Sequence, residues 1–160
     1  DYWCCVNIKY SKNLQFGGSF DNESVIVDLD KSNEATWNTF GFSPYQWMRI
    51  DLSSIYSTSA IKFKLKAIEI PKLQAVLFSY AGKNRRLHKI LNENHFIDKG
   101  NGMYEAILPL KSLMGHSEFR WDALKEIRFK ILKGSQFEIG DFQLIEFRGN
   151  PEKPNKWKGI

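Results

Sequence analysis

The sequence contains only two cysteines, and they are neighbours, Cys4 and Cys5. A disulfide between adjacent cysteines closes only a strained small ring, so we interpret the pair as two free or partly buried thiols. The disulfide framework that stabilises many small secreted domains is therefore excluded. Long apolar runs are also missing. A helix needs roughly 18–20 uninterrupted apolar residues to span a bilayer, so the sequence predicts no membrane span.

The chain lacks the short motifs of common catalytic sites. It has no GxSxG elbow, no GxxxxGK[ST] phosphate loop and no GxGxxG dinucleotide motif. Its three histidines, His88, His95 and His116, do not have the close, repeated spacing of zinc ligands. Glu138 and Asp141 are three positions apart, which puts them on opposite faces of a regular strand rather than in an acid/base pair. We therefore expect no catalytic residues and a protein that is not an enzyme; a small jelly-roll lyase or hydrolase is the weakest hypothesis.

The 160 residues are 42% hydrophobic and 26% charged, a composition that favours one soluble domain with its own core. The net charge of +5 permits anionic partners such as nucleic acid, a membrane surface or an acidic polysaccharide. The sequence shows no RNP-like aromatic motif and no concentrated arginine run, so nucleic acid is not an expected partner.

Alternation with a period of two is the main structural pattern of the chain. In AIKFKLKA (60–67), Ile61, Phe63 and Leu65 would face a core while the intervening lysines face water. Similar strand patterns occur at 6–10, 24–29, 45–52, 73–80, 102–110, 126–132 and 137–147. Turn residues rich in Gly, Pro, Asn and Ser separate these segments. The pattern predicts an all-β protein, an antiparallel β-sandwich or jelly roll.

Helical periodicity is weak and appears only near 87–91 and 121–125, so any helix there should be one or two turns long. We expect a single β-sandwich domain over residues 1–148. Residues 149–160 contain two prolines and many polar and charged residues, which indicates a linker or C-terminal tail. Trp157 lies beyond those prolines, where disorder or contact with a neighbouring domain is expected.

Aromatic and basic side chains share the solvent side of three predicted strands. If these strands belong to one sheet, they form a polar face with Tyr45, Trp47, Arg49, Lys62, Lys64, Lys66, Arg128 and Lys130. Sugars stack their C–H patches on aromatic rings and bind Arg and Lys through hydroxyls or carboxylates, so this face is a candidate polysaccharide site. Trp37, in a predicted loop, is a further candidate. The alternative is an ordinary solvated lysine face, with Trp47 packed under a loop.

Several segments occur in a familiar order: "DLS…Y…IKFKLKA", then "ILPLKSL", then "FEIGDFQLIEF". Over about residues 16–148 the sequence resembles carbohydrate-binding modules with the galactose-binding-like β-sandwich, which are found beside catalytic domains in bacterial polysaccharide-degrading enzymes. The resemblance implies a polysaccharide or oligosaccharide partner, a neighbouring catalytic domain, and a secreted or cell-surface location. A competing hypothesis is a structural accessory domain that packs against the catalytic module and binds no sugar itself.

The same resemblance implies a structural calcium ion, held in this family between an early acidic segment and the last strand. Asp141 matches the acid of the last strand, while Asp21, Asn22 and Glu23 lie where the early ligands fall. Calcium needs six or more oxygen ligands, of which the sequence identifies only a few. The expected metal set is therefore Asp21, Glu23 and Asp141.

Overall fold

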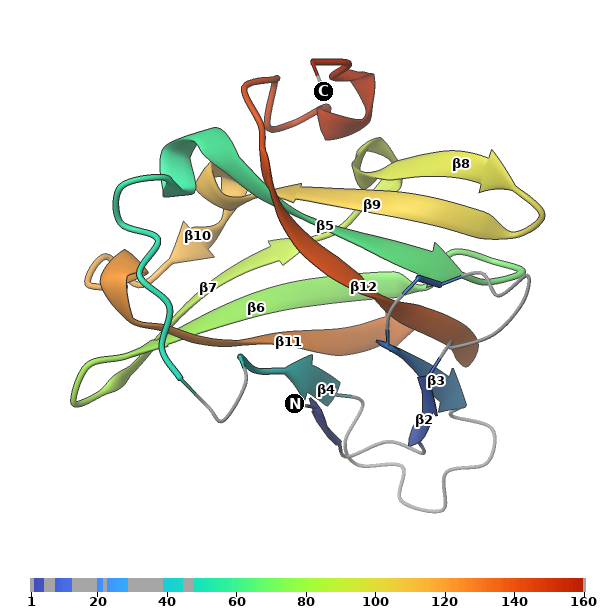
Figure 1. The fold of residues 1–160 in the computed structure, drawn as a ribbon, viewed down its shortest axis with the longest axis horizontal. Helices are drawn as coiled ribbons and strands as arrows, with labels where there is room; N and C mark the ends of the chain where they lie inside the picture. The colour runs from blue at the N-terminus through green and yellow to red at the C-terminus, as the bar shows by residue number, and fades with distance from the viewer. Residues whose placement is uncertain are drawn as a thin grey trace.

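The computed structural model of the protein describes residues 2–4, 8–12, 20–21, 23–28, 39–44 and 48–159, with the backbone alone at 2–4, 8–12 and 23. In this part of the chain, twelve strands form two antiparallel sheets that pack face to face as a β-sandwich (Figure 1). The predicted all-β class and antiparallel sandwich are confirmed.

Six strands build each sheet. Sheet A has the order β1 (Tyr2–Cys4), β4 (Thr39–Phe42), β11 (Leu124–Lys133), β6 (Lys72–Tyr80), β7 (Asn84–Ile90), β10 (Met114–Gly115). Sheet B has the order β2 (Ile8–Lys12), β3 (Glu23–Asp28), β12 (Gln136–Glu146), β5 (Ser59–Lys66), β9 (Met103–Pro109), β8 (Phe96–Gly100). The described helical turns are η3 (Tyr56–Thr58), η4 (Glu93–His95), η5 (Leu110–Ser112), η6 (Trp121–Ala123) and η7 (Pro154–Lys156). None of these turns is long enough to cross a membrane.

The core lies between the sheets and is rich in phenylalanine. Phe63 of β5 and Phe129 of β11 are fully buried, and their ring centroids are 5.4 Å apart across the interface between the sheets. Phe40 of β4 stacks on Phe129 at 5.5 Å. Edge-to-face and offset ring pairs of this kind add about 0.5–1.5 kcal/mol each beyond the burial of apolar area. The alternation of 60–67 and 126–132 therefore predicted the inward residues of both strands correctly.

Of three local predictions, two were wrong and one was confirmed. Residues 84–90 form strand β7 rather than a helical turn, and only Leu87 of that strand reaches the core cluster. Its other positions carry polar or charged side chains or an exposed Ile90, so the apolar alternation of a strand is missing. Residues 121–123 form a single 3-10 turn, as the weak helical periodicity there predicted, and β11 begins at Leu124. The described part of 45–52 contains one isolated bridge, between Ile50 and Leu124, instead of a full strand.

A β-bulge in β12 corrects the prediction that Glu138 and Asp141 lie on opposite faces. Gly140 pairs with Lys64, but the next pair joins Gln143 to Lys62, so β12 carries one extra residue there. Asp141 has a φ of 54° within the bulge. Because of this extra residue, Asp141 contacts Lys64 on the outer face, where Glu138 also lies.

Residues 149–159 fold back onto sheet B, at the C-terminal end seen in Figure 1. The Trp157 ring contacts Phe147 edge-on, with centroids 4.9 Å apart, in a cluster with Ala60 and Ile107. The Asn155 amide donates hydrogen bonds to the carbonyl oxygens of Glu93 and Phe96, at 3.3 and 3.4 Å. The segment expected to be a linker or tail is thus a packed tail, and Trp157 belongs to this domain.

The buried His95 makes the region under this tail sensitive to acid. Its Nδ1 accepts a hydrogen bond from the backbone N–H of Asn92 at 3.0 Å, and burial lowers its pKa below the usual 6.5. Hydrogen bonding of the ring with the backbone of Asn92 and the carboxylates of Glu152 and Glu93 oppose this shift, while Lys89 adds to it. The folded state therefore favours neutral His95, and the associated stability is present above pH 6.5 and lost as the pH falls below it.

We expect the free energy of unfolding to decrease between pH 7 and pH 5 with a slope of at most about 1.4 kcal/mol per pH unit from His95. Urea titrations across this range measure the slope. His95→Gln removes the titrating group, so its stability should change less with pH over the same range. Equal slopes in the two proteins would show that His95 does not carry the effect.

Candidate functional site

The structure divides the predicted polar face between the two sheets. Strand β5 pairs with β12 and β9 in sheet B, whereas β11 pairs with β4 and β6 in sheet A. Lys62 and Lys64 therefore face solvent on one side of the sandwich, and Arg128 and Lys130 face solvent on the other. The assumption that all three strands share one sheet was wrong. Alternation identifies the outward side of a strand, but it carries no information on which sheet the strand joins.

On sheet B, the two lysines have carboxylate partners. Lys62 Nζ lies 3.4 Å from Glu105 Oε2, and Lys64 Nζ lies 2.8 Å from Asp21 Oδ2 and 3.1 Å from Asp141 Oδ2. Both lysine side chains are about three-quarters buried. Partly buried ammonium groups with such partners are suited to holding strands together, because ligand binding would have to displace the carboxylates first.

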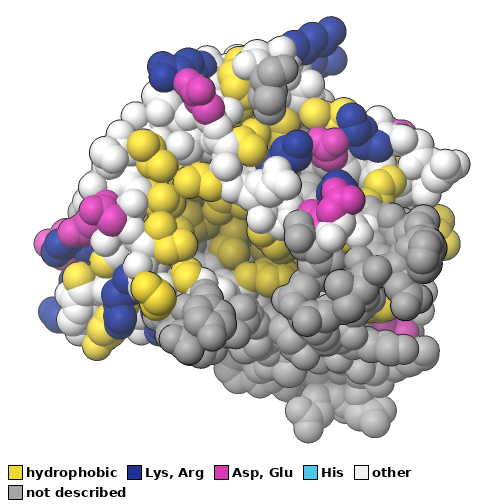
Figure 2. Space-filling view, in the orientation of Figure 1, with side chains coloured by type: hydrophobic (Ala, Val, Ile, Leu, Met, Phe, Trp, Pro, Cys, Tyr) yellow, Lys and Arg dark blue, Asp and Glu magenta, His cyan; other side chains and the backbone are white. Residues whose placement is uncertain are grey.

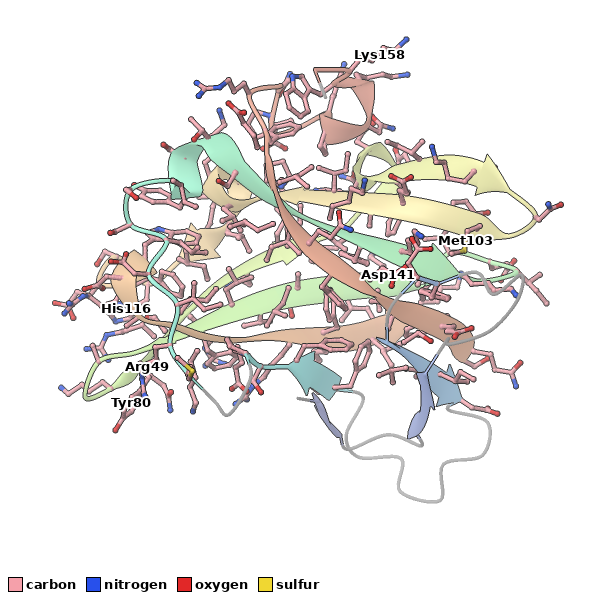
Figure 3. All side chains as sticks on the ribbon, viewed as in Figure 1. Arg49, Tyr80, Met103, His116, Asp141 and Lys158 are labelled. Atoms are coloured by element: carbon pink, nitrogen blue, oxygen red, sulfur yellow. The ribbon has the colours of Figure 1, made fainter. Side chains whose placement is uncertain are left out.

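On the sheet A side of the sandwich, Arg49 and Tyr80 form a cation–π contact at the molecular surface. Arg49 Nε donates a hydrogen bond to the Tyr80 carbonyl oxygen at 3.2 Å, and its guanidinium carbon lies 4.8 Å from the centroid of the Tyr80 ring. Lys125 Nζ lies 5.6 Å from the same centroid. Figure 3 shows Arg49 and Tyr80 together beside the β6–β7 turn. Each exposed cation–π contact of this kind contributes about 0.5–1 kcal/mol.

Arg128 and Phe78 repeat the same pairing further along sheet A. Phe78 lies two positions before Tyr80 on β6, so both rings project from the outer face. The Arg128 guanidinium lies 3.9 Å from the Phe78 centroid, and its Nε and Nη2 both donate to Glu126 Oε1, at 2.9 and 2.6 Å. We refer to the whole set as the cation–aromatic row: Arg49, Tyr80, Lys125, Phe78 and Arg128.

Further basic residues flank the row on the same outer face. Strand β7 places Arg86 opposite Phe78 and His88 opposite Val76, and both side chains are exposed. Lys130, also exposed, lies two positions after Arg128 on β11. The Glu126 carboxylate lies on the same face, but its side chain is only 2% exposed and is bound to Arg128. The surface that a ligand would meet is therefore basic.

The row contains residues that the sequence did not single out. Phe78, Tyr80 and Lys125 of the row were not predicted to be functional, whereas Arg49 and Arg128 were. Beside the row, Lys130 was predicted and Glu126 was not. Strand β6 is apolar at most positions on both faces, so alternation gave no sign that Phe78 and Tyr80 point outward. Trp37, Tyr45 and Trp47 lie outside the residues that the structure describes, and their predicted role in ligand binding stays a prediction.

A hydrophobic hollow opens on the flank between the segment at 50–56 and β12 (Figure 2). Ile50 is 41% exposed although its bridge partner Leu124 belongs to the core, and Leu144, opposite Ile61, is 47% exposed. Tyr56 stacks on Trp121 with centroids 4.6 Å apart. Apolar side chains that remain this exposed at the edge of a core favour contact with another apolar surface.

A second concavity, with a volume of about 1010 Å³, lies at the ends of β3, β5, β9 and β12. Its lining mixes charged and aromatic side chains, including Lys66, Glu69, Tyr104 and Glu138, and Ile68 at its rim is fully exposed. A wide groove with this mixed lining defines no single ligand chemistry.

Comparison with solved structures places this fold. A family 30 carbohydrate-binding module superposes with a TM-score of 0.63 at 11% sequence identity, covering 89% of this chain and 75% of the module. A family 30 module of a cellulosomal cellulase of Clostridium thermocellum gives a TM-score of 0.62 at 11% identity, covering 87% and 82%. The chain has the fold of a carbohydrate-binding module.

A family 11 carbohydrate-binding module from Clostridium thermocellum, in complex with a β-1,3-1,4-mixed-linked tetrasaccharide, gives a TM-score of 0.52 at 12% identity, covering 92% of this chain and 88% of the module. No protein-family model and no curated protein matches the sequence. At this level of identity the likeness establishes the carbohydrate-binding-module fold, and the ligand has to be argued from the residues themselves.

The expected calcium ligands of this carbohydrate-binding-module fold do not fit a calcium site as they stand. Between Asp21 and Asp141 lies the ammonium group of Lys64, at hydrogen-bond distance from both carboxylates. Glu23 is described by its backbone alone. In the described part of the chain, no group of three or more His, Cys, Asp or Glu side chains converges as metal ligands would.

Proposed function

We propose that this chain is a non-catalytic module that binds a polysaccharide on the outer face of sheet A, through the cation–aromatic row. The observation that carries this proposal is the solvent-facing cluster of the exposed Arg49 with the partly exposed Tyr80 and Lys125, continued along the sheet by Arg128, whose guanidinium lies over the buried Phe78 ring. The carbohydrate-binding-module fold supports it. Membership of a larger glycan-degrading enzyme, and a secreted or cell-surface location, are part of the same proposal.

The chemistry of the row suits a sugar chain. Aromatic rings accept the C–H face of a pyranose, and guanidinium groups donate paired hydrogen bonds to hydroxyls or carboxylates. A row of rings and cations along a sheet can contact several units of a polymer, whereas it cannot surround a single small molecule. Because such a face is shallow, the affinity of one site should be modest and should increase with several linked sites.

The flanking charges indicate which polysaccharides to test first. Arg86 and Lys130 are exposed beside the row, so a polymer of uronic acids or sulfated sugars would gain electrostatic attraction that a neutral β-glucan lacks. Affinity electrophoresis in gels that contain either an acidic polymer or mixed-linkage β-glucan compares the two classes directly. Stronger retention by the acidic polymer at low salt, lost at high salt, is the expected result.

Tyr80→Ala and Arg49→Ala should each weaken binding by about tenfold or more, because stacking and charge-assisted hydrogen bonds are worth about 1–3 kcal/mol each. The measurement is retention on the glycan that the wild-type protein binds best. Tyr80→Phe is the matched control, since it keeps the ring, and most of the retention should remain.

Lys62→Ala is a second control, on the opposite face of the sandwich, and should leave binding unchanged. Melting temperatures check that every variant is folded. If Lys62→Ala weakened retention as much as Tyr80→Ala, the assignment to sheet A would be wrong. Trp37→Ala and Trp47→Ala test the predicted aromatic residues in the same assay.

The hydrophobic hollow favours a second candidate function, that of a structural accessory domain that packs against a neighbouring catalytic module. Ile50 in the segment at 50–56 and Leu144 on β12, the two elements that flank the hollow, are exposed apolar side chains of the kind that an interdomain contact covers. Calorimetric titration with the separately produced neighbouring module tests this hypothesis. Heat of binding that Leu144→Gln abolishes, together with no glycan retention, would favour the accessory role.

A further inference from the structure

Three separate segments of sheet B meet at one ammonium group. Lys64 of β5 places its Nζ 2.8 Å from Asp21 Oδ2, before β3, and 3.1 Å from Asp141 Oδ2, in the bulge of β12. The backbone N–H of Asp21 donates to the same Asp141 oxygen at 2.8 Å. Figure 3 shows Asp141 on β12 beside the end of β5.

Asp141 needs this compensation because its carboxylate is taken out of water. Its side chain is 2% exposed, and an ionised carboxylate buried to that degree is costly unless cations and N–H donors surround it. The Lys64 ammonium and the Asp21 N–H supply both. Asp21 is 80% exposed, so its carboxylate closes the cluster from the solvent side.

Two aspartate carboxylates close to one cation supply some of the oxygen ligands that a divalent-cation site needs. Calcium binds carboxylate oxygens at 2.3–2.6 Å and completes its shell with carbonyl oxygens and water. In this protein the convergence point is occupied by an ammonium group at hydrogen-bond distances. The hydrogen bond from Lys64 lowers the pKa of Asp21, and the same bond raises the pKa of Lys64, so both of these groups stay charged at neutral pH.

We propose that Lys64 is a built-in structural cation that occupies a latent divalent-cation site formed by Asp21 and Asp141. The ammonium neutralises the two carboxylates and joins the segment before β3 to β5 and β12, so the fold needs no calcium at this position. When the charge of Lys64 is removed, the two carboxylates lose the cation that they share and take up a divalent cation from solution.

Thermal unfolding in chelator and in calcium tests this proposal. The melting temperatures of the wild-type protein in 5 mM EDTA and in 10 mM CaCl₂ should agree within about 1 °C. Free calcium in these two buffers lies below and above the dissociation constants of weak extracellular calcium sites, about 10⁻⁴–10⁻³ M. Lys64→Met should melt about 4–8 °C lower in EDTA, because it leaves a buried carboxylate without its cation. Calcium should restore at least half of that loss, and NaCl at equal ionic strength should not.

Three further variants make the result specific to this cluster. Lys62→Met removes the neighbouring lysine that pairs with Glu105 and should show no calcium response. Lys64→Met/Asp141→Asn should lose the calcium response of Lys64→Met. Lys64→Arg keeps the charge, so it should stay folded and insensitive to calcium even if Lys64→Met does not fold.

Calcium stabilisation of the wild-type protein by several degrees would overturn the proposal, because a metal would then bind beside Lys64. A calcium response in Lys64→Arg as large as in Lys64→Met, or one that persists in Lys64→Met/Asp141→Asn, would overturn it as well. None of these measurements involves a glycan, so their outcome is independent of the function proposed for sheet A.

Discussion

Replacing Phe129 by alanine is expected to lower the free energy of unfolding by about 3–5 kcal/mol, the range for a fully buried phenylalanine. Phe129 has no exposed surface, and its ring lies within 6 Å of Phe40, Phe63 and Phe142, which come from both sheets. The cavity left by the ring would be lined by rigid aromatic neighbours that cannot collapse into it. Urea or guanidinium denaturation measures the loss.

Leu132→Ala is the control for this substitution. It removes a large apolar side chain from the same strand, but Leu132 is 42% exposed, and the expected change is only about 0.5 kcal/mol. A loss below 1 kcal/mol for Phe129→Ala would contradict the close packing of the two sheets in the phenylalanine core.

Arg128→Ala should destabilise the domain by about 2–3 kcal/mol, although Arg128 was predicted from the sequence to contact a ligand. It would leave the buried Glu126 carboxylate without its guanidinium partner, which usually costs about 3–5 kcal/mol for a fully buried pair. The Arg128 side chain is 34% exposed, so solvent moderates the cost here. Chemical denaturation gives the stability change, and glycan retention is measured separately on the folded fraction.

A double-mutant cycle separates the ion pair from packing on Phe78. Glu126→Gln in the Arg128→Ala background removes the carboxylate charge that had lost its guanidinium partner and should recover part of the lost stability. No recovery would mean that stacking of the guanidinium on the Phe78 ring, rather than the charge pair, accounts for the loss. Arg128→Lys should retain only part of the stability that Arg128→Ala loses, because an ammonium group cannot reproduce the two hydrogen bonds to Glu126 Oε1.

The regular strands were the most predictable elements. Phe63 and Leu65 on β5, and Ile127 and Phe129 on β11, were expected to be buried and are buried, because a half-buried strand imposes a period of two on its side chains. Strand β7 could not be recognised in this way. It contributes only Leu87 to the core, and its remaining positions carry no apolar alternation.

The bulge in β12 shows a second limit of local patterns. Counting along a regular strand separates Glu138 from Asp141, but the extra residue at the bulge brings Asp141 to Lys64. In the segment FEIGDFQLIEF only the Gly140–Asp141 pair, which tolerates unusual backbone conformations, could have indicated the β-bulge. The contact that organises the proposed cation site therefore arises between distant segments.

Local side-chain chemistry was enough to establish the class of protein: the alternation, turn residues and resemblance led to an antiparallel β-sandwich with outward-facing basic side chains. Strand pairing could not be obtained in that way, because hydrogen bonds between strands join residues far apart in the chain and leave no periodic trace in it. That pairing places Arg128 on sheet A beside Phe78, and the isolated bridge between Ile50 and Leu124 brings Arg49 to the Tyr80 ring. The same pairing places Lys62 and Lys64 on sheet B, where they form salt bridges with neighbouring carboxylates.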